Sequence, residues 1–111
     1  MNMSAAVSRN VFREKYNGTV TAGNSVGPFA ADDCLLYPTW GFRVLSTKRG
    51  RLTVEYSPDG TNWDTLDTVR VRGNIPRNLV YRVTLRYYRV SFTNTSSSDA
   101  TVKIDTVRST V

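Results

Sequence analysis

The sequence predicts an all-β fold, a single antiparallel β-sandwich that is jelly-roll-like and carries an N-terminal arm. Three observations predict it. Thr and Val occur 14 times each and Gln is absent, a composition that favours strands over helices. From residue 41 onward, apolar and polar side chains alternate with the period of a strand. Turn signals containing Gly, Pro, Asn or Asp separate the alternating stretches at the short intervals of a sandwich.

The first 17 residues follow neither the strand period nor the helix period. The segment has a net charge of +2, because its three cations, Arg9, Arg13 and Lys15, outnumber its one acid, Glu14. We expect residues 1–17 to form an arm that is mobile alone and becomes ordered on a partner. The sandwich domain would then cover 18–111. The alternative is that the segment is a first strand or a short helix of the domain.

Two short strand-like pieces follow the arm, at 18–22 and 34–37. The alternating segments after them predict strands with one buried face and one face toward water or a partner. These strands are expected at 42–44, 51–57, 67–73, 79–85, 87–93 and 100–106. The alternation shifts between Leu85 and Tyr88, so a tight turn or a β-bulge must absorb one residue there.

The hairpin turn at 57–60 places Pro and Gly where a tight turn needs them, and Trp63 can then fold back onto a core with Tyr88 and Phe92. Asp59 and Asp64 are oxygen ligands that could hold Ca²⁺. No dense acidic loop surrounds them, so we expect hydrogen bonds within the turn instead.

Neighbouring acids elsewhere do not form a shared site. Asp32 and Asp33 are consecutive, and neighbours in an extended chain point to opposite sides, so they would not share one metal ion or proton. The next residue, Cys34, lies before two leucines and is expected to be a small buried apolar group.

The composition excludes several kinds of chemistry. The chain has no His and one Cys, which excludes a Ser-His-Asp or Cys-His nucleophile pair, an internal disulfide and an ordinary structural zinc site. We expect no catalytic residue, no cofactor and no metal, and only a carboxylate mechanism would remain open to an enzyme. No apolar run has the length of a membrane span.

The net charge of +6 and the pI near 9.9 come mainly from arginine, which makes up 12 of the 15 cations. Arg favours interfaces with carboxylates and phosphates. Five residues that we predict to bind a partner lie on the outward phase of three strands: Arg70, Arg72, Arg82, Tyr87 and Arg89. We predict that two residues of the arm, Arg9 and Arg13, bind the same partner. An Arg-rich face formed by these strands could equally pair with acids of an adjoining subunit or with acids of its own sheet. Nucleic acid is less favoured, because no basic helix, Gly-rich phosphate loop or RNA-binding sheet signature is present.

Two stretches resemble known families. The run LTVEYSPDGTNWD at 52–64 resembles the hairpin of galactose-binding, discoidin-like sandwiches, and RYYRVSFTN at 86–94 resembles a strand of the same group. Their order also resembles small β-sandwich modules of virion proteins, both phage tail components and minor capsid proteins of large DNA viruses. The resemblance covers about 42–107. It implies a fold more than a task, and no ligand-binding residue is carried over from it.

These observations lead to a first hypothesis, a non-enzymatic virion structural protein that docks on other capsid or tail subunits through the Arg-rich face and the arm. Its partners would be other virion proteins or further copies of the chain. The alternative is a carbohydrate-binding module that recognises glycans through exposed aromatic rings. A nucleic-acid binder that uses the basic face is the third hypothesis, and it predicts affinity that falls steeply with salt.

Overall fold

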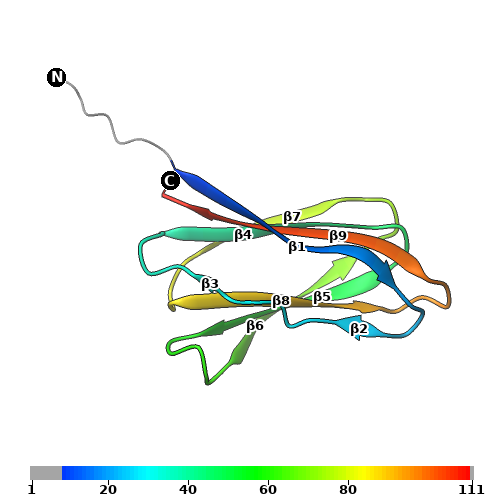
Figure 1. Cartoon of the computed structure of the whole chain (residues 1–111), viewed down its shortest axis with the longest axis horizontal. Helices are drawn as coiled ribbons and strands as arrows, with labels where there is room; N and C mark the ends of the chain where they lie inside the picture. Colours follow the sequence, from blue (N-terminus) through cyan, green and yellow to red (C-terminus); the bar gives the residue numbers. More distant parts are fainter. Residues whose placement is uncertain (1–8, 111) are drawn as a thin grey trace.

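The computed structural model describes residues 9–110, and these form two antiparallel sheets packed face to face (Figure 1). The prediction of an all-β sandwich is confirmed. Sheet I has the strand order β1-β9-β4-β7, and its strands are β1 (Asn10–Val20), β4 (Thr39–Ser46), β7 (Arg77–Arg82) and β9 (Ala100–Ser109). No helix in the described part of the chain is long and apolar enough to cross a membrane.

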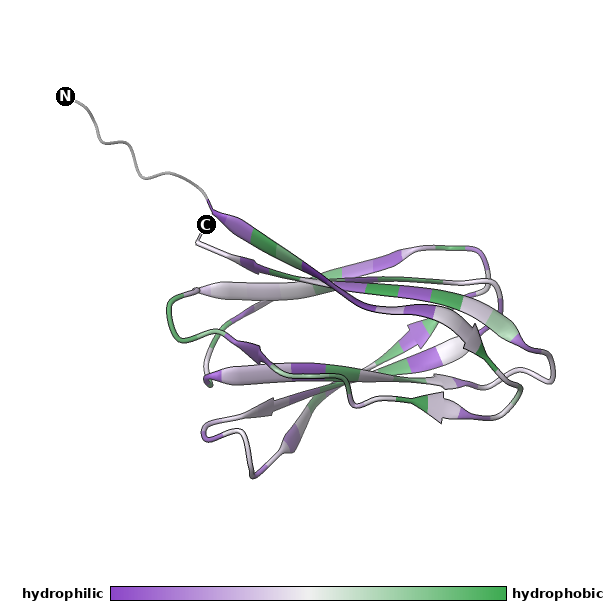
Figure 2. Cartoon of the chain, in the orientation of Figure 1, coloured by the Kyte–Doolittle hydropathy of each residue, from purple (hydrophilic) through white to green (hydrophobic). Residues whose placement is uncertain are grey.

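Sheet II has the order β2-β8-β5-β6. The short strand β3 also pairs with β8, at Tyr87 and Tyr88. Its strands are β2 (Ser25–Val26), β3 (Asp32–Asp33), β5 (Gly50–Ser57), β6 (Asp64–Val71) and β8 (Tyr87–Asn94). Strands β5 and β6 form the predicted hairpin, and Gly60 in its turn has a φ of 79°, a left-handed conformation that favours glycine. The alternation of hydrophilic and hydrophobic residues along these strands is visible in Figure 2.

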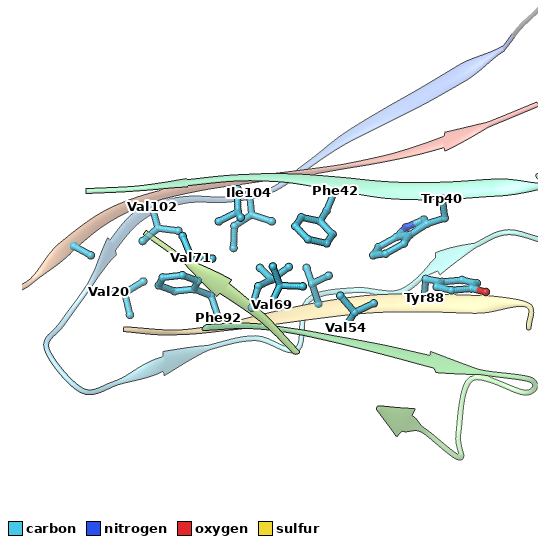
Figure 3. Packing of buried hydrophobic residues seen from close by; sticks show 14 of the residues in the cluster. Val20, Trp40, Phe42, Val54, Val69, Val71, Tyr88, Phe92, Val102 and Ile104 are labelled. Carbon is cyan, nitrogen blue, oxygen red and sulfur yellow. The ribbon is translucent and has the colours of Figure 1, made fainter. Parts of the chain in front are cut away.

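The core lies between the sheets and is built from the alternating inward positions. Trp40 packs on Tyr88 with ring centroids 5.2 Å apart, and Phe92, Leu52 and Ile104 are fully buried (Figure 3). Burial of this kind is the dominant stabilising term of a sandwich. The expected core tryptophan was the wrong one. Trp63 is only half-buried, and it lies outside the buried core cluster that contains Trp40.

The structure places 10–17 differently from the expected arm. These residues form most of β1, which pairs with β9 over its length, so the alternative of a first strand describes them. A β-bulge between Glu14 and Tyr16 explains why the segment follows no single period, since the extra residue shifts the alternation. Residues 1–8 of the expected arm lie outside the described residues.

Other element boundaries also differ from expectation. The piece at 34–37 is a turn instead of a strand, closed by the amide of Tyr37 donating to the carbonyl of Cys34, and Leu36 is 80% exposed. The phase shift before Tyr88 is a crossover between the two sheets, because β7 belongs to sheet I and β8 to sheet II. The Tyr88 hydroxyl accepts a hydrogen bond from the amide of Thr84 in this connection.

The two ends of the described chain meet at one end of sheet I (Figure 1). The amide of Thr110 donates to the carbonyl of Arg9 at 3.0 Å, and the amide of Arg9 donates to the Thr110 hydroxyl at 2.7 Å. These bonds continue the ladder between β1 and β9.

Candidate functional site

The seven residues predicted to bind a partner do not form one face. Arg70 and Arg72 lie together at the end of β6, whereas Tyr87 and Arg89 lie on β8 toward the opposite end of sheet II. Arg82 is on β7 in the other sheet, where it is opposite Thr39. Arg9 and Arg13 flank the start of β1, outside the core. The face that we expected from alternation is therefore divided among separate parts of the surface.

Arg89 already has a partner within the chain. Its guanidinium donates to Glu55 at 2.8 Å and lies 3.9 Å from the centre of the Trp63 ring. The ion pair and the cation–π contact hold the side chain against the outer face of sheet II. The charge of Arg89 is therefore largely compensated before any partner arrives.

Tyr87 lies beside a second internal pair. The guanidinium of Arg86 lies 5.0 Å from the centre of the Tyr87 ring and donates two hydrogen bonds to Asp33, of 3.0 and 2.8 Å. These hydrogen bonds hold the pKa of the Asp33 carboxyl below its usual range, because they stabilise the charged form. The same pair anchors β3 to the start of β8.

The arginine cluster brings together four cations that form no ion pair within residues 9–110. It consists of Arg49, Arg51, Arg70 and Arg72, which line a hollow of about 530 Å³ together with Thr68 and Thr95. Arg51 and Arg70 are directly opposite each other on β5 and β6. The sequence pattern predicts Arg70 and Arg72 as partner-binding residues but not Arg49 and Arg51, although Arg51 has the same outward phase in its own strand.

An apolar row crosses the outer face of sheet I. It consists of Phe12 on β1, Val107 on β9, Gly41 on β4 and Val80 on β7, which are cross-strand neighbours in that order. Phe12 is 66% exposed and Val80 is 70% exposed. A shallow hollow of about 270 Å³ lies over the row. Large exposed apolar side chains that are contiguous mark contact sites more often than isolated ones do.

A buried charged network connects sheet I with β3. Asp32 is 3% exposed, and its carboxylate accepts hydrogen bonds from Lys15 at 2.6 Å, from the Trp40 indole at 2.9 Å and from the Thr106 hydroxyl at 2.6 Å. Lys15 is the extra residue of the bulge in β1, and it also donates to the carbonyl of Ala30. The expectation that Asp32 and Asp33 point to opposite sides is confirmed, since Asp32 is buried and Asp33 is half-buried.

The hairpin turn at 57–60 uses Asp59 for turn hydrogen bonds. Its carboxylate accepts from the amides of Thr61 and Asn62 and from the Ser57 hydroxyl, which lowers the pKa of Asp59 well below its usual range. Within 9–110, no three His, Cys, Asp or Glu residues come close enough to hold a metal ion.

The single cysteine is buried in the core, as expected. Burial, with the nearby Asp32 carboxylate as a smaller cause, raises the pKa of the Cys34 thiol to about 12. The nucleophilic thiolate is therefore scarce at neutral pH, and Cys34 is an inert packing residue in the folded chain.

The fold occurs in solved proteins of several kinds. The chain is similar to the PBSX exported protein XepA, with a TM-score of 0.76 and 18% identity over 88% of this chain, which corresponds to 36% of XepA. It is also similar to the SPBc2 prophage-derived protein YomS, with a TM-score of 0.62 and 8% identity, over 97% of this chain and 99% of YomS. A protein of Bacillus endospore appendages, described as disulfide-linked pili, matches with a TM-score of 0.51 and 16% identity, over 97% of this chain and 96% of that one.

At these identities the similarities establish the fold alone. The chain spans about a third of XepA, so it corresponds to one part of that protein. The predicted resemblance to discoidin-like modules has no counterpart among these three structures. No curated protein sequence matches the chain. A family model described as the N-terminal domain of the uncharacterised protein YqxG matches residues 4–107, and the chain therefore belongs to that family.

Proposed function

We propose that the chain is a non-enzymatic structural module of a virion or of an exported assembly related to phage, and that it docks on a neighbouring protein subunit. The observation that carries the proposal is the apolar row, which crosses all four strands of sheet I and is covered by no other element of residues 9–110. Two of the similar structures support the setting, since one is an exported protein and the other is prophage-derived.

The surroundings of the apolar row have the anatomy of a protein interface. The cross-strand row on one side of it contains Glu14, Asp105 and Arg43. The cross-strand row on its other side ends at Arg82 on β7. An apolar centre with a polar and charged rim is typical of surfaces that bind other proteins. This arrangement moves the expected docking surface from one Arg-rich face to sheet I, where Arg82 and the start of β1 contribute to it.

Gly41 makes the middle of the row flat. A Cβ atom at this position would lie 2.6 Å from the carbonyl oxygen of Leu79, so no side chain fits there. Gly41 itself is buried, and the Cγ2 atom of Val80 lies 3.2 Å from the same Cβ position, so the Val80 side chain packs over the glycine and continues the apolar surface from β7 onto β4.

The structure supports the carbohydrate-binding alternative less than it supports protein docking. The aromatic rings that we would expect to stack on sugars are those of Trp63 and Tyr87, and each has a guanidinium against one face of the ring. We therefore retain protein docking as the proposed function.

The test introduces a charge into the row. We expect Val80→Glu to remove the chain from native particles or exported assemblies separated on density gradients, because it places a charge on the most exposed apolar side chain of the row. Thr19→Glu is the matched control, since Thr19 is exposed on the same face of β1 but several residues from the row. Cross-linking mass spectrometry would name the neighbouring subunit. Unchanged assembly of a folded Val80→Glu protein would overturn the proposal.

A further inference from the structure

The arginine cluster lies on the outer face of sheet II, on the side of the sandwich opposite the apolar row. Its position follows from strand register, because Arg51 on β5 faces Arg70 on β6 while Leu52 and Val69 beside them are buried. Arg49 lies two residues before Arg51 and Arg72 lies two residues after Arg70, so each has the outward phase of its neighbour. Four arginines therefore line one hollow of about 530 Å³.

No carboxylate of the described chain compensates these charges. The ion pairs found within 9–110 use other cations, Lys15, Arg86, Arg89 and Lys103. Like charges directly opposite each other on neighbouring strands destabilise a sheet. The cluster thus carries an electrostatic cost that an external anion would remove, and an unpaired concentration of arginine is the usual footprint of an anionic ligand.

A second hollow of about 290 Å³ adjoins the first and shares Arg70 and Arg72 with it. Arg77 and Ile75 complete its lining, and the guanidinium of Arg77 is held by a 3.0 Å hydrogen bond to the carbonyl of Arg70. Two adjoining basic hollows with two arginines in common can take two anionic groups that are close together. This spacing favours an extended ligand with repeated charges over a single small anion.

The donors in the hollows indicate the kind of anion. Each guanidinium offers parallel N–H groups that match the oxygens of phosphate, and the hydroxyls of Thr68 and Thr95 add further donors to the first hollow. A carboxylate and an internal phosphate each offer two charged oxygens, but the phosphates of a linear polymer follow one another at close intervals, whereas the carboxylates of a protein stand on separate side chains. Four arginines around one hollow therefore fit phosphate better than the side chains of an acidic protein.

We propose that the arginine cluster binds successive phosphate groups of a linear polyanion, and that it recognises the phosphates and not the groups attached to them. Neither hollow is lined by an aromatic ring in the described part of the chain, so bases have no stacking platform at the site. This binding does not rest on the docking function, because none of the residues that line the two hollows belongs to the apolar row.

The experiment measures binding of the full chain to linear inorganic polyphosphate by calorimetry at several salt concentrations. We expect an association constant whose logarithm falls linearly with the logarithm of salt concentration, and much weaker binding of inorganic orthophosphate at equal phosphate concentration. The double variant Arg70→Gln, Arg72→Gln should bind polyphosphate at least about tenfold more weakly. Its salt slope should be smaller by roughly one for each phosphate that the variant no longer binds.

The matched control is Arg13→Gln with Arg82→Gln, which removes the same charge from sheet I. Equal weakening by both double variants would overturn the proposal, because net charge alone would then explain the binding. Tighter binding of poly-glutamate of matched charge would also overturn it in favour of an acidic protein.

Three further arms identify the source of the phosphate. Single-stranded DNA should bind as polyphosphate does at equal phosphate concentration, and markedly tighter DNA binding would contradict recognition of phosphate alone. Binding to vesicles with anionic headgroups but not to polyphosphate would overturn the linear ligand in favour of a membrane surface. A glycerol phosphate polymer that competes with polyphosphate for the wild-type chain, but has no effect on the residual binding of the Arg70, Arg72 variant, supports the proposal.

Discussion

The Asp32 network and the arginine cluster show two opposite ways in which one small sandwich handles charge. Lys15 is 11% exposed and Asp32 is 3% exposed, and hydrogen-bond partners from three strands surround the carboxylate. The four arginines of the cluster face water and have no carboxylate partner in the described chain. Buried charge must be satisfied by the fold itself, whereas exposed charge can be left for a ligand. Substitutions should therefore affect stability at the first region and binding at the second.

The largest effect is expected from Asp32→Ala. The change leaves the ammonium of Lys15 and the Trp40 indole N–H buried without their acceptor, and it should cost about 3–5 kcal/mol of unfolding free energy. Urea denaturation followed by circular dichroism measures this loss. Asp33→Ala is the control, since Asp33 is only half-buried and should cost far less. Equal losses in the two variants would contradict a structural role for the network.

Lys15→Met should have the second largest effect. It removes the counter-charge of Asp32 but keeps the apolar stem, and the carboxylate retains its bonds from Trp40 and Thr106. We expect a loss of about 1.5–3 kcal/mol, the range for a hydrogen bond to a charged group. A double-mutant cycle with Asp32→Ala would show that the two effects are coupled. Additive losses would mean that the pair does not act as a unit.

Arg51→Gln should change stability little and in the opposite direction. The substitution relieves the repulsion from Arg70, so the protein should gain up to about 0.5 kcal/mol in low salt. The gain should disappear in high salt, where the repulsion is screened. Thermal unfolding at two salt concentrations checks this result. A clear loss of stability would show that the cluster is structural and would weaken its assignment as a ligand site.

The exposed pair of Asp33 and Arg86 gives the smallest effect, visible mainly in titration. Because the pKa of Asp33 is lowered in the folded chain, its contribution to stability is present above the ordinary pKa of the carboxyl and is lost as the pH falls through the lowered value. Arg86→Gln should raise this pKa toward its usual range. Carboxyl NMR of the two proteins measures the change, and an unaltered Asp33 titration would show that Arg86 is not what lowers the pKa.

The sequence pattern predicted the sandwich and most of its inward positions correctly. The alternation in 51–57 and 87–93 predicts β5 and β8 almost to the residue, because buried residues alternate with less buried ones along β8 and along β5 as far as Glu55. The boundaries failed where local and tertiary signals differ. Leu35 and Leu36 favour a strand by composition, but they lie in an exposed turn.

The candidate sites were harder to predict, because alternation gives the face of a residue but not the neighbours of its strand. Arg70, Arg82 and Arg89 share an outward phase, yet β7 lies in the other sheet and β6 pairs only with β5. The cross-strand neighbour of Arg70 is therefore on β5, and the periodicity of the sequence does not show which strands pair. The inward position of Lys15 was hidden for a different reason, since a bulge cannot be distinguished from irregular sequence without its partner strand.

The hydrogen bonds between Arg9 and Thr110 bring the two ends of the described chain to one place on the sandwich. Any polypeptide joined to the two ends would therefore start from neighbouring positions. The sandwich should be insertable into a surface loop of another protein without separating the ends of that loop. Joining the two ends by a short linker and opening the 57–60 turn should likewise give a circular permutant with the same two sheets. The outer faces of both sheets would remain available in either arrangement.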